Sequence, residues 1–193
     1  MEIEKYVEIR KNYLEDSVYT QLLKWVENDV IYTDAEVTRE GRSMVDYDTR
    51  KTKEKLLIND GRERNYTTIF WYNFLCSCFV ASTKSYYQKN NFPMAPIDED
   101  LDLSVLKYKE AFYFKPHVDH GPSTPRTLSY IYVLNDDYEG GHLQFFFPKI
   151  KDSTKTIKVE KNCLIIFPSN MLFPHAVTPV TKGVRYSVVG WMR

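Results

Sequence analysis

LSYIYVLNDDYEGGHLQFFF, residues 128–147, is the stretch that decides the fold of this chain. Its first part, Leu128–Leu134, is a run of aliphatic and aromatic residues that is typical of a buried strand. Asn135-Asp136-Asp137 ends that strand with turn residues, and Gly140-Gly141 completes a tight turn into a second apolar run, Leu143–Phe147. The stretch therefore predicts two strands joined by a turn that contains glycine.

Similar short runs, separated by turn residues, occupy the rest of the chain from about Leu103 onward. The other predicted strands are a bent strand or hairpin with Val105, Lys107 and Ala111–Lys115, then Thr154–Val159, Cys163–Phe167, Ala176–Val180 and Val184–Trp191. Several short strands at this spacing are typical of a double-sheet jelly roll. We therefore predict an α+β protein whose mainly β core is a double-stranded β-helix (jelly roll) over residues 103–192, flanked by N-terminal helices.

The first half of the chain, residues 1–95, is predicted to be helix-rich. Asp16 or Ser17 is expected to cap a helix whose apolar residues recur at helical spacing. These residues are Val18, Leu22, Leu23 and Trp25. Asn65–Lys89 is a second helical segment, although its many aromatic residues leave a strand open as an alternative for its first half. Thr33–Lys55 is expected to hold a strand and a mobile loop, and it is the candidate lid over the site.

Composition limits the classes of protein to which the chain can belong. A length of 193 residues predicts a single domain, 1–193, and 43% hydrophobic with 15% aromatic residues excludes a disordered chain. The formal net charge is zero, so a nucleic acid is a disfavoured partner, and no apolar run is long enough to predict a membrane partner. Three cysteines and a charged N-terminus without an apolar signal segment predict a cytoplasmic location.

Two histidines and one aspartate are the candidate metal ligands. His117 and Asp119 are two residues apart, so on a strand or its extended exit they point to the same side. His175 follows several predicted strands later, and we expect it to come from the opposite side of the jelly roll. Two imidazoles and one carboxylate can occupy one face of an octahedral Fe(II) and leave three positions open for other ligands.

Arg185 and Ser187 are also two residues apart and are expected to share one face of a strand. Together they could hold one carboxylate of a small dicarboxylic co-substrate, the guanidinium in a bidentate pair and the hydroxyl as an extra donor. The competing interpretation makes the arginine a surface salt-bridge residue and the three candidate ligands hydrogen-bonded structural residues. The remaining histidines, His120 and His142, are expected in surface positions.

Seven short motifs follow one another along the second half of the chain. They are Tyr108, Lys115–Asp119, Leu128–Gly141, Phe167-Pro168-Ser169, His175–Val180, Gly183–Ser187 and Trp191. In this order they resemble the Fe(II)- and 2-oxoglutarate-dependent dioxygenases, particularly the prolyl-4-hydroxylase-like branch. The resemblance covers about residues 103–192 and is specific because so many short motifs occur in order. It implies a jelly-roll enzyme with an iron centre.

The resemblance also assigns roles to residues. It implies four catalytic positions: His117, Asp119, His175 and Arg185. The first three bind Fe(II), and the arginine holds the C5 carboxylate of 2-oxoglutarate, with Ser187 and Tyr108 as further co-substrate residues. Dioxygen is the other co-substrate that the resemblance implies, and ascorbate is an additional expected ligand.

The implied reaction is hydroxylation of a substrate C–H bond with release of succinate and carbon dioxide, and peptidyl proline in a peptide or protein is the leading substrate. The alternatives are the same chemistry on a small metabolite, free amino acid or nucleobase, a metal-dependent isomerase or hydrolase, or a non-catalytic jelly-roll metal-binding module. Two positions depart from the family pattern. Val133 stands where many relatives have a tyrosine, and Arg185 stands where collagen-type prolyl 4-hydroxylases have lysine.

Overall fold

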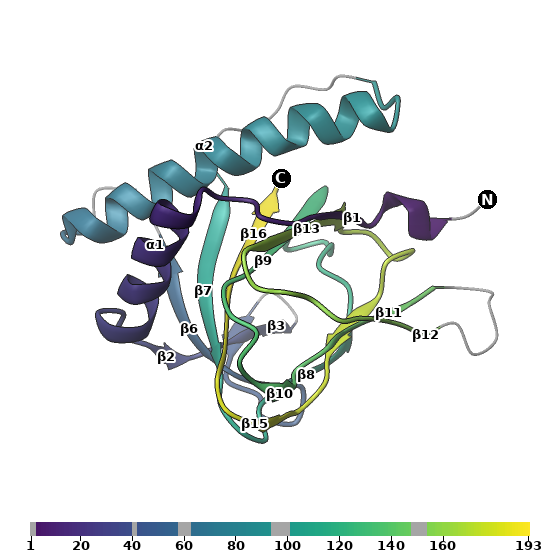
Figure 1. Ribbon diagram of the computed structural model, residues 1–193. Coiled ribbons are helices and arrows are strands. Elements are labelled where there is room, and N and C mark those ends of the chain that lie inside the picture. Colours follow the sequence, from purple (N-terminus) through teal and green to yellow (C-terminus); the bar gives the residue numbers. More distant parts are fainter. Residues whose placement is uncertain (1–2, 40–41, 58–62, 94–100, 148–153) are drawn as a thin grey trace.

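The computed structural model describes residues 3–39, 42–57, 63–93, 101–147 and 154–193, whose core is two facing antiparallel sheets (Figure 1). The larger sheet has the strand order β1 (Glu8–Arg10), β13 (Cys163–Pro168), β9 (Leu128–Val133), β16 (Arg185–Met192), β7 (Asp102–Tyr108), β6 (Lys53–Leu57) and β2 (Thr33–Asp34). The smaller sheet has the order β12 (Thr154–Ile157), β11 (Leu143–Phe146), β14 (His175–Val177), β8 (Tyr113–His117) and β5 (Arg50–Lys51). The predicted jelly roll with a mainly β core is confirmed.

Strand β9 lies in the interior of the larger sheet, between β13 and β16, and all six of its residues are buried. Side chains alternate along a strand, so Tyr130 and Tyr132 pack toward the helices, whereas Ile131 and Val133 pack between the two sheets. A strand covered on both faces has apolar residues at consecutive positions. This is why the run Leu128–Leu134 is apolar and aromatic throughout and does not alternate with polar residues.

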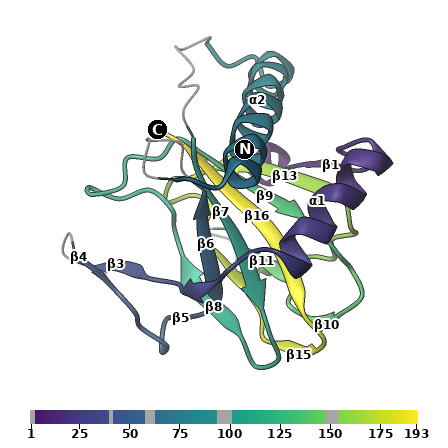
Figure 2. The same ribbon diagram turned by 90° about the vertical axis from the view of Figure 1, so that its left-hand side faces the viewer.

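Two helices cover the outer face of the larger sheet, α1 (Asp16–Asn28) and α2 (Tyr66–Lys89) (Figures 1 and 2). The N-cap of α1 is Glu15 and not Asp16 or Ser17 as predicted; the Ser17 hydroxyl donates to the Glu15 carboxylate at 2.8 Å. Asn65 caps α2, which is helical throughout, so the strand alternative for its first half is wrong. Of the helices among the described residues, none is long and apolar enough to cross a membrane.

One predicted strand, Ala176–Val180, is divided between two strands. Val177 ends β14 in the smaller sheet, and Val180 begins β15 (Val180–Lys182), which pairs with β10 (Glu139–Gly140). The intervening Pro179 has no backbone N–H to donate to a strand neighbour, which explains the interruption. The pair β10–β15 closes the same end of the jelly roll at which β16 begins (Figure 1).

The segment Thr33–Lys55 contains more strand than predicted and connects the two sheets. Its strands β2 and β6 form the edge of the larger sheet, whereas β5 pairs with β8 in the smaller sheet. Between β2 and β5, the strands β3 (Val37–Arg39) and β4 (Arg42–Met44) form a hairpin that projects from the two sheets (Figure 2); residues 40–41 lie outside the described part. The segment therefore borders the space between the sheets, where the candidate site lies.

Candidate active site

His117 and His175 are direct neighbours in the smaller sheet. His117 is the last residue of β8 and His175 the first of β14, and the two residues are paired in register across these strands. Their ring centroids are 4.3 Å apart. The expectation that His175 comes from the opposite side of the jelly roll is therefore wrong, because β8 and β14 are hydrogen-bonded neighbours although β9 to β13 separate them in sequence.

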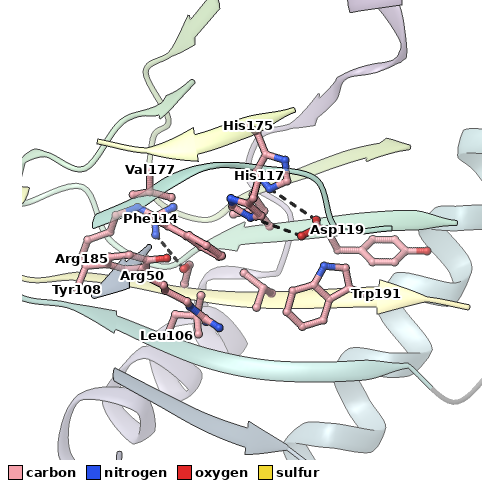
Figure 3. Close-up of a pocket in the computed structure, with 14 residues that line it drawn as sticks. Arg50, Leu106, Tyr108, Phe114, His117, Asp119, His175, Val177, Arg185 and Trp191 are labelled. Carbon is pink, nitrogen blue, oxygen red and sulfur yellow. Dashed lines mark hydrogen bonds and ion pairs between the residues drawn. The ribbon is translucent and has the colours of Figure 1, made fainter. Parts of the chain in front are cut away.

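Asp119 lies two residues beyond the end of β8 and completes the cluster (Figure 3). Its Oδ1 is 3.5 Å from His117 Nε2, and its Oδ2 is 3.6 Å from His175 Nε2. One potential ligand atom from each of the three residues lies within 4.8 Å of the others. Among the described residues this is the one group of three or more metal-binding side chains at such spacing, and it consists of the three predicted ligands.

Backbone carbonyls hold the outer nitrogens of both imidazoles. His117 Nδ1 is 2.8 Å from the Lys115 carbonyl oxygen, and His175 Nδ1 is 3.1 Å from that of Phe173. A carbonyl only accepts, so Nδ1 carries the proton in each ring and Nε2 keeps its lone pair. Both Nε2 atoms lie on the side of Asp119, which is the arrangement that metal-binding histidines adopt.

The charge state of the cluster also suits a divalent cation. Burial alone would raise the pKa of Asp119, but the nearby imidazoles of His175 and His117 and the hydrogen bond from Ser129 lower it well below its usual range. Burial, foremost, lowers the pKa of His175 to about 4, so this imidazole is neutral at physiological pH. The structure therefore presents an ionised carboxylate and a neutral imidazole, the forms that bind a metal.

Arg185 is the most unusual buried group beside this cluster. Its side chain is almost completely buried on β16, and Nη1 donates to the Ser187 hydroxyl at 3.0 Å. Its Nε and Nη2 are buried and have no hydrogen-bond partner among the described residues. The guanidinium carbon is 5.3 Å from the ring centroid of Tyr108, which is also buried. A buried cation without a counter-ion is costly, so this arrangement is that of a binding site for an anion.

Two cavities reach the metal-ligand cluster, and Figure 3 shows the residues that line the inner one. The inner cavity has a volume of about 30 Å³. It is lined by Arg185, Ser187 and Tyr108 and by apolar side chains from both sheets. The outer cleft, of about 580 Å³, opens beside the segment that connects the sheets. Residues that line both are Arg50, Phe114, His117, Asp119 and Trp191. A small molecule in the inner cavity and a larger one in the cleft would both reach the cluster.

Sequence reasoning missed two residues of the site, Arg50 and Phe114. The Phe114 ring stacks on His117 with centroids 3.5 Å apart, and the Arg50 guanidinium carbon lies 5.0 Å from the Phe114 ring centroid. Phe114 was detectable, since it lies on the strand that leads into His117. Arg50 belongs to no recognisable motif, and it reaches the site because β5 pairs with β8.

The other residues singled out in the sequence are not part of the metal-ligand cluster. Val133 is buried between the sheets, and the Tyr130 hydroxyl is hydrogen-bonded to Thr83 of α2. Tyr130 therefore does not supply the hydroxyl that relatives place at position 133. His120 is exposed, with Nδ1 2.8 Å from the carbonyl oxygen of Arg126, and His142 is exposed at the start of the smaller sheet.

Comparison with known proteins agrees with this site. The family model described as the 2OG-Fe(II) oxygenase superfamily matches residues 103–193. A PKHD-type hydroxylase of Maricaulis maris is 32% identical over 95 residues, which are 47% of this chain and 41% of the relative. The chain thus spans less than half the length of this curated relative.

Two solved structures share the fold. A Trichoplax adhaerens prolyl hydroxylase, in complex with a hypoxia inducible factor oxygen degradation domain peptide fragment, superposes with a TM-score of 0.75 at 22% identity, over 97% of this chain and 83% of that one. A Pseudomonas putida prolyl-4-hydroxylase gives 0.69 at 19% identity, over 97% and 92%. Residues 103–193 of the chain are thus similar to the 2OG-Fe(II) oxygenase superfamily, and the fold is similar to that of the two prolyl hydroxylases.

Proposed function

We propose that the protein is an Fe(II)- and 2-oxoglutarate-dependent dioxygenase that hydroxylates peptidyl proline and releases succinate and carbon dioxide. The observation that carries this proposal is Arg185, a buried guanidinium that lines the same cavity as the three candidate metal ligands. Two of its nitrogens have no hydrogen-bond partner in the described part of the chain. A metal-binding module without a co-substrate has no use for such a charge, and its burial would only destabilise the fold.

His117, Asp119 and His175 would hold the iron, and their donor set suits it. Two imidazoles and one carboxylate on one side of a metal are the ligands of non-haem Fe(II) oxygenases, which keep the other positions open. When bound, iron and 2-oxoglutarate supply the oxidative chemistry that converts a C–H bond to an alcohol. The protein holds the ligand nitrogens in the correct tautomer through the carbonyls of Lys115 and Phe173.

Arg185 and Ser187 would bind the far carboxylate of the co-substrate. The Ser187 oxygen accepts from Arg185 Nη1, so its own hydroxyl hydrogen is free to donate to an anion. The guanidinium Nε and Nη2 offer further donors, and the buried ring of Tyr108 forms part of the wall. Leu106, Ile131, Val177 and Val189 complete an apolar lining that excludes water and strengthens these charged hydrogen bonds.

The outer cleft supports a peptide substrate. Its lining includes Arg50 and Arg126, each with a buried Nε that has no partner among the described residues. The Arg126 guanidinium carbon lies 3.7 Å from the Trp191 ring centroid, and both residues line the cleft together with His117 and Asp119. Such donors suit peptide carbonyl oxygens, and the Trichoplax adhaerens relative is known in complex with a peptide. Ascorbate as a reductant and a cytoplasmic location stay predictions.

The test is turnover of the iron-loaded protein with 2-oxoglutarate and a library of proline-containing peptides. Succinate is measured by NMR, and each peptide by mass spectrometry for the gain of one oxygen atom. We expect both products with wild-type protein, and neither with His175→Ala. The exposed His142→Ala is the matched control and should behave as wild type. Succinate without any oxidised peptide would point to a different substrate, and no succinate with any substrate would contradict the proposal.

A further inference from the structure

We infer that Ser129 and Ser169 are positioning residues that fix the carboxylate of Asp119 for metal binding, an inference that rests on the proposed metal site. The Ser129 hydroxyl donates to Asp119 Oδ2 at 2.6 Å, and the two serine oxygens are 2.8 Å apart. Both serines are about 1% exposed, so no water competes for these hydrogen bonds. Neither serine was singled out by its chemistry in the sequence.

The direction of both hydrogen bonds follows from the charge on Asp119. An ionised carboxylate can only accept, so Ser129 uses its single hydroxyl hydrogen on Oδ2. The Ser129 oxygen can then only accept from its neighbour, and Ser169 must donate to it. The chain Ser169 to Ser129 to Asp119 is therefore polarised in one direction, which strengthens the bond to the carboxylate.

This chain of hydrogen bonds connects Asp119 to the opposite sheet. The two histidine ligands lie on the smaller sheet, and Asp119 follows the end of its strand β8. Ser129 lies on β9 of the larger sheet, and Ser169 directly follows β13 of the same sheet. The backbone supports the contact, since the His120 amide donates to the Ser169 carbonyl oxygen at 3.0 Å. The two serines of the larger sheet thus fix the carboxylate of Asp119 relative to the two histidine ligands on the smaller sheet.

The consequence for the metal is geometric. Asp119 lies on a loop, so its carboxylate could rotate about χ1 and χ2 if only the strand end positioned it. With Oδ2 held by Ser129, each carboxylate oxygen stays beside one imidazole, Oδ1 at 3.5 Å from His117 Nε2 and Oδ2 at 3.6 Å from His175 Nε2. Hydrogen-bond partners of metal ligands commonly change metal affinity by 10–100-fold, so the effect should be measurable with the metal alone.

The test is a titration of Mn²⁺ into the metal-free protein, followed by the EPR signal of the free ion. We expect Ser129→Ala to raise the dissociation constant by about 10–100-fold. Ser169→Ala keeps the bond to Asp119 but removes its polarising partner, so a smaller increase, about threefold or more, is expected. The matched control is Ser82→Ala, since Ser82 is also buried but lies on α2, outside the linings of both cavities, with its hydroxyl 2.9 Å from that of Tyr13.

The outcomes separate this inference from the proposed function. Thermal unfolding of the metal-free variants shows whether they fold, and a purely structural role would lower stability without changing the Mn²⁺ constant of the folded protein. A dissociation constant within about twofold of wild type for Ser129→Ala would overturn the positioning role while leaving the metal site intact. If Ser129→Ala does not fold, Ser169→Ala decides by the same criterion. Absence of Mn²⁺ binding by wild type would overturn the metal site itself, and the positioning role with it.

Discussion

At the residue scale, the burial of Arg185 indicates a binding site for an anionic ligand. Folding places its guanidinium out of water, with one nitrogen bonded to a neutral hydroxyl and two others without a partner among the residues that the structure describes. An uncompensated buried charge normally costs several kcal/mol, and a protein keeps it only where a partner compensates for it. The residue is therefore expected to reduce the stability of the ligand-free protein and to become favourable when the carboxylate binds.

Replacement of Arg185 by methionine tests this expectation. We expect Arg185→Met to leave the free energy of unfolding of the ligand-free protein unchanged or to raise it by about 1–3 kcal/mol, because it removes a buried charge while keeping most of the volume. The same variant should lose the increase in melting temperature that 2-oxoglutarate gives to the Mn²⁺-loaded protein. Urea denaturation and thermal melts measure the two effects. A variant that is less stable than wild type and whose melting temperature still rises with 2-oxoglutarate would contradict this role of Arg185.

His175 should make the stability of the metal-free protein depend on pH. Its pKa is about 4 in the folded protein and near 6.5 in an exposed chain, so the unfolded state takes up a proton that the folded state does not. Stability is therefore present above pH 6.5 and falls as the pH decreases toward 4, by up to about 3 kcal/mol from this group. Urea denaturation at pH 7 and about pH 4.5 measures the loss. His175→Gln should lose less than wild type over this range, and a parallel decrease would show that other groups cause it.

At the scale of elements, the two helices differ in how they begin. The Asn65 side chain accepts from the backbone amides of Thr67 at 2.9 Å and Thr68 at 3.1 Å, so it satisfies two free N–H groups of α2. Glu15, at the corresponding position of α1, makes no side-chain hydrogen bond to the helix backbone. The helix α2 packs its buried side against the larger sheet, so its start influences the support of that sheet.

The two caps provide a matched pair of variants. Asn65→Ala should reduce the free energy of unfolding by about 1 kcal/mol, because two amides lose their acceptor. Glu15→Ala should change it by less than about 0.5 kcal/mol, because no capping bond is lost. Chemical denaturation of the two variants beside wild type measures the difference. Equal effects would mean that the caps do not determine how these helices begin.

The turn between β10 and β11 packs against Arg185, the residue proposed to bind the co-substrate. Gly141 has φ = +58°, and a Cβ atom there would lie 3.1 Å from Arg185 Cδ and 3.0 Å from Val180 Cγ2. A side chain at this position would therefore strain the backbone, because φ is positive, and it would press against the side chain of Arg185.

Alanine substitutions at two glycines separate this effect from a general one. Gly141→Ala should lower the free energy of unfolding by about 1–3 kcal/mol and also raise the dissociation constant for 2-oxoglutarate, because Arg185 has to move. Gly121→Ala is the control, since its Cβ would meet only the Thr124 hydroxyl oxygen at an ordinary 3.4 Å and its φ is not positive. Calorimetric titration of the Mn²⁺-loaded variants with 2-oxoglutarate gives the constants. An unchanged dissociation constant for 2-oxoglutarate in Gly141→Ala would show that the turn does not influence binding by Arg185.

At the scale of the whole molecule, the site depends on both sheets at once. The smaller sheet holds two imidazoles, the larger sheet holds Arg185 and Ser187, and Asp119 bridges them through Ser129. A metal bound to this cluster would therefore stabilise the relative position of the sheets and, by mass action, the folded state as a whole.

Addition of Mn²⁺ tests this link. At a free concentration 100 times its dissociation constant, the ion should raise the free energy of unfolding by about 2.7 kcal/mol. Asp119→Ala should remove this increase, whereas Asp48→Ala, an exposed carboxylate away from the cluster, should keep it. Urea denaturation with and without Mn²⁺ measures both. The same increase in Asp119→Ala would place the ion elsewhere on the protein.

Several features could be predicted from sequence because they depend on local patterns. The apolar run Leu128–Leu134 predicted a buried strand, and the two-residue spacings of His117 with Asp119 and of Arg185 with Ser187 predicted shared faces. The structure brings each of these pairs together, at 3.5 Å and 3.0 Å between their nearest polar atoms. Period-two alternation is a property of the backbone itself, so it is visible without knowledge of the partner strands.

Other features were decided by tertiary structure alone. His175 lies beside His117 because β14 pairs with β8. The pairing of strands far apart in the sequence cannot be predicted from a local pattern. The positions of Arg50, which arrives through β5, and of Ser129 and Ser169, which reach Asp119 across the two sheets, have the same origin. The main strands of the second half, the ligand types and the fold class could be predicted, because they follow from local spacing and composition. Only the packing of one sheet on the other decided which side chains surround the ligands, because that proximity exists only after the chain has folded.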